Sequence, residues 1–198
     1  MADAKSVMEL RNQTGAGVVD CKQALEEAGG DMAKATDILR KKGAAKAARK
    51  NAERTVSEGI LASYLHHNRR LAAIVEVQCE TDFVALNQDF VNFANDMAMQ
   101  IAAMNPEYVA PENIPAEVMD KQRALFMEEL ASENKPDEIK AKIVEGKLNK
   151  WYSDVCLMKQ TFFKDDDKTV EALLTELIAK TGEKIVIARF SRLEMAHA

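Results

Sequence analysis

The chain has 198 residues, a formal net charge of −5, 47% hydrophobic residues and only 6% aromatic residues. This length suits one mid-sized domain or a small module plus an ordinary domain, and the acidic balance argues against general nucleic-acid binding. No apolar run approaches the roughly 20 residues of a membrane helix, and the first residues lack the apolar core of a signal peptide. The three cysteines are widely spaced and suggest neither a metal site nor disulfides. We therefore expect a cytoplasmic protein.

Three short helical patterns predict a small three-helix domain over residues 1–43. Asp3 and Asp31 stand at expected N-caps, Gly29 and Gly30 follow the second helix, and Gly43 is expected to end the third. Such a bundle has little core, so its surface is expected to be specialised for contact. The apolar positions at helical spacing are Val7, Met8, Val18, Cys21, Leu25, Ala28, Met32, Ala35, Ile38 and Leu39.

The turn between the first two of these helices is unusually apolar. Val18 and Val19 follow Gly17, where a turn that only reverses the chain would carry polar residues. With Leu10 beside them, these valines predict an outward apolar patch, and such patches usually bind a partner.

Residues 44–55 are rich in alanine and basic residues and predict a helical linker. The cations Lys46, Arg49, Lys50 and Arg54 recur at helical spacing. Two interpretations stay open. A solvated linker is favoured because the chain as a whole is acidic, and contact with RNA or phosphate is the alternative.

The hydrophobic period then changes from helix to strand. Alternating residues over 56–66 and 71–79, joined by a turn at 67–69, predict a β-hairpin, and residues 185–190 form a third candidate strand that could pair with it. Between them lie helical patterns over 90–104, 115–130, 136–155 and 170–182. The expected fold class is α+β, with a core domain over 56–198 in which helices cover a small antiparallel sheet.

An enzyme would most plausibly use Cys79, His66 and Asp82 as nucleophile, base and orienting carboxylate. The predicted hairpin argues against this, because His66 lies near its turn and Cys79 at its far end. At ~3.3 Å per strand residue the two side chains are about 25 Å apart, too far to share a proton. We therefore expect no catalytic residue.

The segment from Cys79 to Val84 leaves a strand and enters a helix. Thr81 or Asp82 is a suitable N-cap there, and Phe83 could simply pack into the core. Taken alone, this structural interpretation is the simpler one.

Two motifs together resemble the translation elongation factor Ts family. The first is Leu10-Arg11-x-x-Thr14-Gly15-Ala16-Gly17-x-x-Asp20-Cys21-Lys22-x-Ala24-Leu25, and the second is Thr81-Asp82-Phe83-Val84. Shorter matches at 106–108, 135–147 and 168–170 extend the resemblance over nearly the whole chain. It implies a ubiquitin-associated-like three-helix domain, an α+β core, and nucleotide exchange on elongation factor Tu by binding, with no cofactor and no metal ion of its own.

The resemblance also implies roles for particular residues. Leu10, Val18 and Val19 would dock on the nucleotide-binding domain of elongation factor Tu, although many relatives carry larger side chains at the valine positions. The second motif would enter near the partner's magnesium ion, with Phe83 in a side-chain pocket. Its residues are Thr81, Asp82, Phe83 and Val84. Displacing ligands of Mg²⁺ weakens its binding sharply and would release GDP.

Long members of the family carry two copies of the core half, whereas this chain has one. It therefore resembles the short form, and we expect a homodimer in a two-to-two complex with elongation factor Tu, with no membrane and no direct nucleic-acid contact. Tyr64-x-His66 resembles a partner-contacting motif of the second copy, so His66 of the second protomer could take that role, or it could be an ordinary turn histidine. The rival interpretation is an adaptor that binds without exchange activity.

Overall fold

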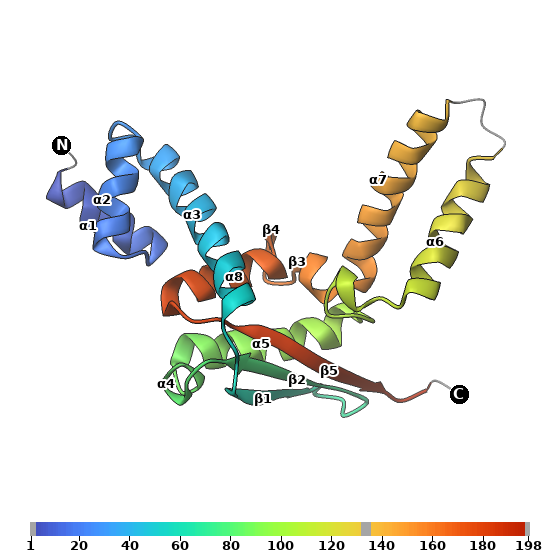
Figure 1. Cartoon of the computed structure of the whole chain (residues 1–198). Coiled ribbons are helices and arrows are strands. Elements are labelled where there is room, and N and C mark those ends of the chain that lie inside the picture. Colours follow the sequence, from blue (N-terminus) through green and yellow to red (C-terminus); the bar gives the residue numbers. More distant parts are fainter. Residues whose placement is uncertain (1–2, 132–135, 197–198) are drawn as a thin grey trace. The chain divides into compact units, whose positions relative to one another are not determined.

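A computed structural model describes residues 3–131 and 136–196. Within these ranges, the side chains of residues 44–53 are not described. The fold is α+β, as predicted: helices come first, and antiparallel strands packed with helices follow (Figure 1). The helices are α1 (Ala4–Thr14), α2 (Val18–Glu27), α3 (Met32–Glu53), α4 (Asp82–Ala85), α5 (Gln88–Met104), α6 (Ala116–Glu129), α7 (Asp137–Val155) and α8 (Val170–Thr181), with short 3-10 turns at Pro111–Asn113 and Leu157–Lys159. The strands are β1 (Glu58–Leu65), β2 (Leu71–Cys79), β3 (Thr161–Phe162), β4 (Asp165–Thr169) and β5 (Val186–Glu194).

The main sheet has the strand order β1-β2-β5, which confirms the predicted hairpin and its third strand. The hairpin closes where the backbone N–H of His66 donates to the carbonyl of Leu71 at 2.9 Å. Strand β5 runs antiparallel to β2, since the N–H of Met195 donates to the carbonyl of Arg70 at 2.9 Å. A second sheet, β3-β4, was not predicted, because the acidic segment Asp165–Thr169 lacks a strand-like apolar pattern.

The chain divides into two compact units that cut across the main sheet. The first comprises residues 1–61, 76–94 and 172–187, and the second comprises residues 62–75, 95–171 and 188–198. Each is described by itself below.

The first unit contains the N-terminal bundle of α1, α2 and the start of α3 (Figure 1). Its core is small, as predicted, but Met8, which its helical spacing placed on the inner side, is 48% exposed. Asp31 caps α3 by accepting a hydrogen bond from the N–H of Lys34 at 3.1 Å, and this bond lowers the pKa of the Asp31 carboxyl. The buried side chains are Val7, Leu10, Cys21, Ala24, Leu25, Ala35 and Leu39.

Helix α3 does not end at Gly43, contrary to the sequence-based prediction, but continues to Glu53. One glycine costs a helix only about 1 kcal/mol, and the alanine- and lysine-rich residues that follow have high helix propensity. A Cβ at Gly43 would lie 3.5 Å from the Cβ of Ala179 on α8, so the helix passes close to α8 at this glycine.

The rest of the first unit joins the ends of the three strands to α4, the first half of α5 and most of α8. Phe90 and Ala94 on α5 are fully buried, as are Val77 and Ile185 near the strand ends. Helix α8 ends at Gly182, as predicted, with φ of +77° and its N–H bonded to the carbonyl of Ile178 at 2.9 Å. The core of this unit therefore includes side chains from α5, from β2 and from the segment that enters β5.

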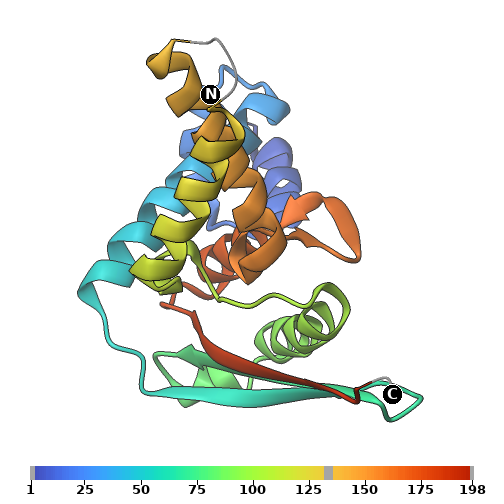
Figure 2. The same ribbon diagram turned by 90° about the vertical axis from the view of Figure 1, so that its right-hand side faces the viewer.

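The second unit contains the remainder of the main sheet and of α5, and the helices α6 and α7, which run side by side (Figures 1 and 2). Leu125 and Ile139 lie on the apolar stripes of the helical patterns predicted over 115–130 and 136–155, but they are 53% and 48% exposed. A two-helix pair buries only one face of each helix, so part of each stripe stays in solvent. The small core between α6 and α7 is formed by Leu130, Val144 and Leu148.

A buried amide pair fastens β3 in the second unit. The side-chain amide of Gln100 donates to the Oε1 of Gln160 at 3.2 Å and to the carbonyl of Thr161 at 2.9 Å. The Oε1 of Gln100 accepts from the N–H of Phe163 at 2.9 Å. Since both glutamines are almost completely buried, these bonds satisfy polar atoms that would otherwise be costly to bury.

Within the described ranges, no helix is both long enough and apolar enough to cross a bilayer.

Candidate partner-binding site

The second predicted motif forms the start of α4, directly after strand β2. We call its residues, Thr81, Asp82, Phe83 and Val84, the Phe83 turn. Thr81 is the N-cap of α4, with an extended backbone at φ −128° and ψ 156°, and its hydroxyl oxygen accepts from the N–H of Val84 at 3.5 Å. The predicted cap is thereby confirmed.

Phe83 is 82% exposed, and the interpretation in which it packs into the core of its own chain is wrong. Leu86, three residues further on, is 81% exposed. Residues three apart lie on the same side of a helical turn, so the two apolar side chains can contact one surface together. The buried Ala85 lies between them in sequence and faces the protein interior.

Leu86 was missed by the sequence analysis. The sequence signal that could have found it is the spacing of Phe83 and Leu86, because residues three apart lie on the same side of a helical turn. The short length of α4 was not evident from the sequence.

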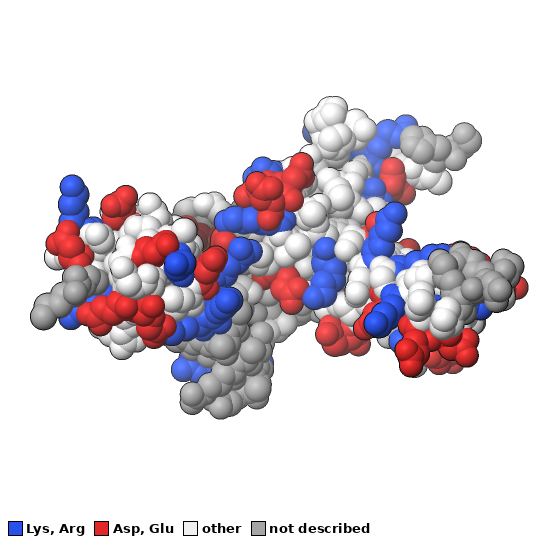
Figure 3. Space-filling model, turned by 90° about the horizontal axis from the view of Figure 1, so that it is seen from above, with Lys and Arg blue, Asp and Glu red and all other residues white. Residues whose placement is uncertain are grey.

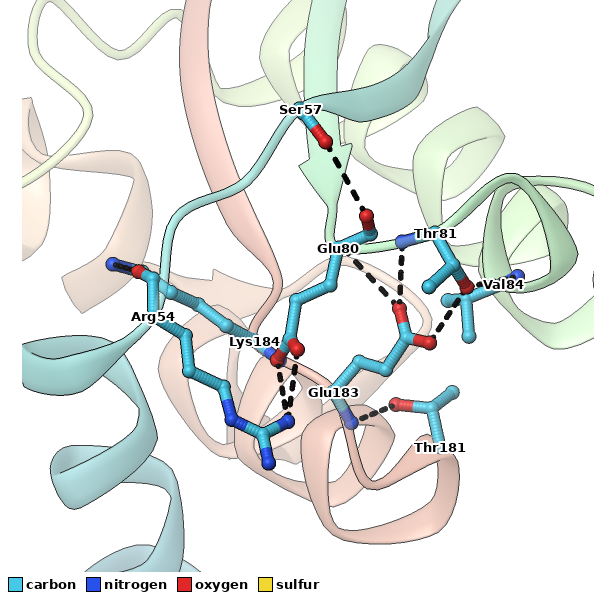
Figure 4. A network of polar contacts seen from close by, with 8 residues as sticks. All are labelled: Arg54, Ser57, Glu80, Thr81, Val84, Thr181, Glu183 and Lys184. Carbon is cyan, nitrogen blue, oxygen red and sulfur yellow. Dashed lines mark hydrogen bonds and ion pairs between the residues drawn. The ribbon is translucent and has the colours of Figure 1, made fainter.

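Glu183 fastens the Phe83 turn from the segment that follows α8 (Figure 4). Its Oε1 accepts from the hydroxyl of Thr81 at 2.7 Å. Its Oε2 accepts from the backbone N–H groups of Glu80 and Thr81 at 3.2 and 3.1 Å. One carboxylate oxygen therefore accepts from two consecutive backbone N–H groups just after the end of β2.

A second carboxylate supports the same segment (Figure 4). Both oxygens of Glu80 accept from one guanidinium nitrogen of Arg54, at 2.8 and 3.1 Å, and Glu80 also accepts from the N–H of Lys184. The ammonium of Lys184 donates to the carbonyl of Arg54 at 2.8 Å. Arg54, which was predicted to face solvent, thus links the end of the 44–55 segment to Glu80, the residue just before the Phe83 turn.

The N-terminal motif forms the turn between α1 and α2. Gly15 ends α1 in the left-handed conformation at φ +68°, and its N–H donates to the carbonyl of Arg11 at 2.8 Å. Val18 and Val19 begin α2 and are 45% and 69% exposed. These two residues, the valine patch, lie on the surface where the sequence placed them.

Leu10 was expected to lie in the same outward patch, but it is fully buried. It belongs to the bundle core, where it packs with Val7, Cys21 and Leu25. The hydroxyl of Thr14, at the start of the turn, donates a hydrogen bond to the carbonyl of Leu10 at 2.7 Å. Leu10 therefore supports the turn from below and does not reach a partner in this conformation.

His66 follows the last residue of β1 in the second unit and is partly exposed. Its Nδ1 lies 2.9 Å from the hydroxyl oxygen of Tyr64, and its ring centroid lies 4.2 Å from that of His67. These contacts fix the orientation of the imidazole at the hairpin end.

Cys79 is fully buried, and its thiol donates to the carbonyl of Thr81 at 3.2 Å. Burial, reinforced by the charge of Glu183, raises the pKa of the Cys79 thiol to about 11. A nucleophilic cysteine needs the opposite, a lowered pKa and access to solvent. Cys79 is thus unsuited to nucleophilic catalysis.

Two further features bear on ligands. Among the side chains of residues 3–43, 54–131 and 136–196, no group of three or more histidine, cysteine, aspartate or glutamate residues could hold a metal ion. Acidic and basic side chains are interspersed among the described residues on the face shown in Figure 3. The cations Lys46, Arg49 and Lys50, on which the RNA alternative depends, lie outside the described side chains.

A fastened turn that presents two exposed apolar side chains is typical of proteins that act by contact with another protein. The family model described as "Elongation factor TS" matches residues 33–176. Relatives named elongation factor Ts include those of Caldanaerobacter subterraneus, 50% identical over 98% of this chain and 96% of the relative, and Thermotoga petrophila, 52% identical over 96% and 94%. That of Carboxydothermus hydrogenoformans is 51% identical over 98% of this chain and 89% of the relative.

The chain belongs to the elongation factor Ts family. It is a nucleotide exchange factor for elongation factor Tu in translation elongation, and it is not an enzyme in its own right. Family membership thereby excludes the rival interpretation, which was an adaptor that binds without promoting nucleotide exchange. Its match to relatives of similar length also assigns it to the short form.

Proposed function

We propose that the Phe83 turn is the part of the protein that weakens magnesium and GDP binding in elongation factor Tu. The observation that carries this proposal is the 82% exposure of Phe83 on a turn whose backbone is held by partly buried hydrogen bonds to Glu183. An exposed phenylalanine is unfavourable in water, and a partner pocket recovers that free energy when it encloses the ring.

The free energy gained by enclosing Phe83 in a partner pocket is large enough to weaken magnesium binding. Burying one phenylalanine side chain contributes roughly 1.5–3 kcal/mol, and the adjacent Leu86 adds a comparable amount if it reaches the same surface. Mg²⁺ requires near-ideal octahedral geometry, so a small displacement of its ligands weakens it sharply. The nucleotide phosphates then lose their main compensating charge, and GDP dissociates.

Asp82 is exposed beside Phe83 and would enter the same region of the partner. Thr81 and Val84 would act through their positions in the turn, since their mutual hydrogen bond shapes it. No group is transferred in this process. Coupling is reciprocal: if this protein weakens GDP binding, GDP weakens binding of this protein by the same factor.

The valine patch is the proposed second contact, on the nucleotide-binding domain of elongation factor Tu. In this arrangement residues 1–43 form a docking domain, residues 44–55 a helical linker, and residues 56–198 the core that carries the Phe83 turn. Contact through the valine patch would increase the affinity for elongation factor Tu, and contact through the Phe83 turn would promote release of GDP.

We further propose a homodimer that binds two copies of elongation factor Tu, with the protein acting in the cytoplasm. Support comes from the face of the main sheet in the second unit. The pairing of His66 with Leu71 and of Met195 with Arg70 places Leu65, Ala72 and Leu193 in one row across the three strands. Leu65 and Leu193 are 60% and 73% exposed, and a second copy would cover them.

His66 of the second protomer is the proposed additional contact with elongation factor Tu. Mixed dimers in which one chain carries His66→Ala and the other carries Phe83→Ala test this. Sharing between protomers predicts that the mixed species retains one complete site and exchanges faster than either parent. Equal rates for the mixed species and both parents would rule it out.

The test of the central proposal measures release of fluorescent GDP from elongation factor Tu as the protein is titrated in. Phe83→Ala is expected to lower the maximal stimulated rate by at least about tenfold, the equivalent of about 1.4 kcal/mol. Leu125→Ala, which truncates an exposed leucine on α6, is the matched control and should leave the rate unchanged. Equal rates for Phe83→Ala and the parent would overturn the proposal.

A further inference from the structure

Glu183 lies outside both sequence motifs, yet it is the residue that fixes the second of them. It follows Gly182 at the end of α8 and is separated from Thr81 by 102 positions in the chain. Its own backbone is held in place, since its N–H donates to the hydroxyl oxygen of Thr181 at 3.4 Å and that hydroxyl donates to the carbonyl of Leu177 at 2.9 Å. The backbone of Glu183 is therefore anchored to α8.

The three hydrogen bonds that this carboxylate accepts all come from the segment that enters the Phe83 turn. Two come from the backbone N–H groups of Glu80 and Thr81, and the third comes from the hydroxyl of Thr81 (Figure 4). Hydrogen bonds to a charged acceptor are roughly twice as strong as neutral ones. One side chain thus determines the path of two consecutive peptide units just before Phe83.

The carboxylate also fixes the direction of the Thr81 hydroxyl. An ionised carboxylate only accepts hydrogen bonds, so the hydroxyl must donate its single proton to Glu183 at 2.7 Å. A lone pair on the hydroxyl oxygen is then directed to the N–H of Val84, 3.5 Å away. Glu183 therefore acts on α4 through Thr81, and it orders the cap on which Phe83 depends.

A turn that is ordered before binding loses less conformational entropy when its partner encloses it. Resting on the function proposed above, we propose that Glu183 is a positioning residue for nucleotide exchange: its carboxylate holds the Phe83 turn in the conformation that engages elongation factor Tu. Glu183 itself does not contact the nucleotide or its metal ion. Its effect on exchange passes through Phe83.

The main variant is Glu183→Gln, which keeps the size of the side chain but replaces one accepting oxygen with an NH₂ group. Whichever way the amide lies, either the Thr81 hydroxyl or the two backbone N–H groups then face an NH₂ group in place of an acceptor, so the hydrogen bonds that order the cap cannot all form. We expect the maximal rate of fluorescent GDP release from elongation factor Tu to fall about fivefold. Glu129→Gln removes the same charge from an exposed ion pair with Lys147 and should leave the rate unchanged.

A double-mutant cycle separates positioning from general structural support. If Glu183 acts through Phe83, Glu183→Gln should lower the rate less than about twofold once Phe83→Ala is present. The same fold-loss in both backgrounds would overturn the positioning role. Thr81→Val breaks the same bond from the other side, and it should reproduce the loss, whereas Thr81→Ser should retain the rate.

These outcomes keep the two proposals apart. If Phe83→Ala leaves exchange unchanged, the proposed function of the turn is wrong. If Phe83→Ala impairs exchange while Glu183→Gln and Thr81→Val do not, only the positioning role of Glu183 is wrong. Thermal unfolding of each variant is measured alongside, and Thr81→Val supplies the answer should Glu183→Gln fail to fold.

Discussion

Phe83 and Phe90 are seven residues apart and have opposite environments: Phe83 is 82% exposed, and Phe90 is fully buried. The first projects from α4 into solvent, and the second packs from α5 into the core of the same unit. A chain does not gain stability from an exposed benzyl group. This contrast is the observation on which the proposed contact of Phe83 with elongation factor Tu rests.

This contrast predicts different costs for the same substitution. Phe83→Ala should change the free energy of unfolding by less than about 0.5 kcal/mol, because it removes few internal contacts. Phe90→Ala should cost about 3–5 kcal/mol through the cavity that it leaves. Urea denaturation followed by circular dichroism measures both. A large loss of stability in Phe83→Ala would mean that the ring packs against its own chain.

Substitution of the valine patch should reduce affinity and spare the maximal rate. Val18 and Val19 are 45% and 69% exposed, so docking can bury part of each, worth about 1–2 kcal/mol together. Replacing both by serine should raise the concentration for half-maximal GDP release roughly tenfold. Ile139→Ser on α7 is the control, since Ile139 is 48% exposed and distant in sequence. An unchanged half-maximal concentration would remove the patch from the interface.

The buried thiols predict a loss of stability in alkali. Burial raises the pKa of Cys79 and of Cys156 from 9.0 to about 11, and the charges of Glu183 and Glu112 respectively add to the effect. The folded state keeps these protons while the unfolded state releases them, so unfolding becomes easier as pH rises from about 9 to about 11. The decrease is at most about 1.4 kcal/mol per pH unit for each thiol.

Urea denaturation at pH 8, 9 and 10 measures this decrease. Cys79→Ala combined with Cys156→Ala lowers stability overall by removing packed atoms, but it should flatten the dependence on pH. An equally steep pH dependence in the double variant would assign the effect to other groups.

The proposed dimer predicts that a charge placed on the sheet face will separate the protomers. Leu65→Lys and Leu193→Lys each put an ammonium into the apolar row, where a second copy would have to bury it without a partner. Sedimentation equilibrium should show a dimer for the parent and for Leu125→Lys, and a monomer for the two sheet variants. A monomeric parent at micromolar concentrations would contradict the proposed assembly.

Much of the fold could be predicted because its signals are local. The stripe that includes Phe90 and Met97 predicts α5, and alternating residues predict β1 and β2. Gly43 misled because a single glycine is a weak helix breaker within a strongly helical segment. The sheet of β3 and β4 was missed because β3 is held by a residue distant in the chain: the side chain of Gln100, some 60 residues earlier, donates to the carbonyl of Thr161.

The candidate site was only partly predictable, because some of its contacts are local in the sequence and others join distant segments. The motif containing Phe83 is contiguous, so the sequence located it, but the exposure of Phe83 depends on how short α4 is. Leu10 and Val18 are close in sequence, and only packing decides that Leu10 is buried while Val18 is not. Glu183 could not be found from the chain order, because its bond to Thr81 joins segments that meet only in the folded protein.

The central claim is that Phe83 promotes GDP release by weakening magnesium binding in elongation factor Tu. Its most direct test is the ratio of the maximal GDP release rates produced by the parent protein and by Phe83→Ala, measured once in millimolar magnesium and once in excess chelator. The account predicts a ratio of at least about ten in magnesium and a ratio close to one in chelator, where the metal is already gone. The same large ratio in both conditions would show that Phe83 acts on the nucleotide by another route and would contradict the account.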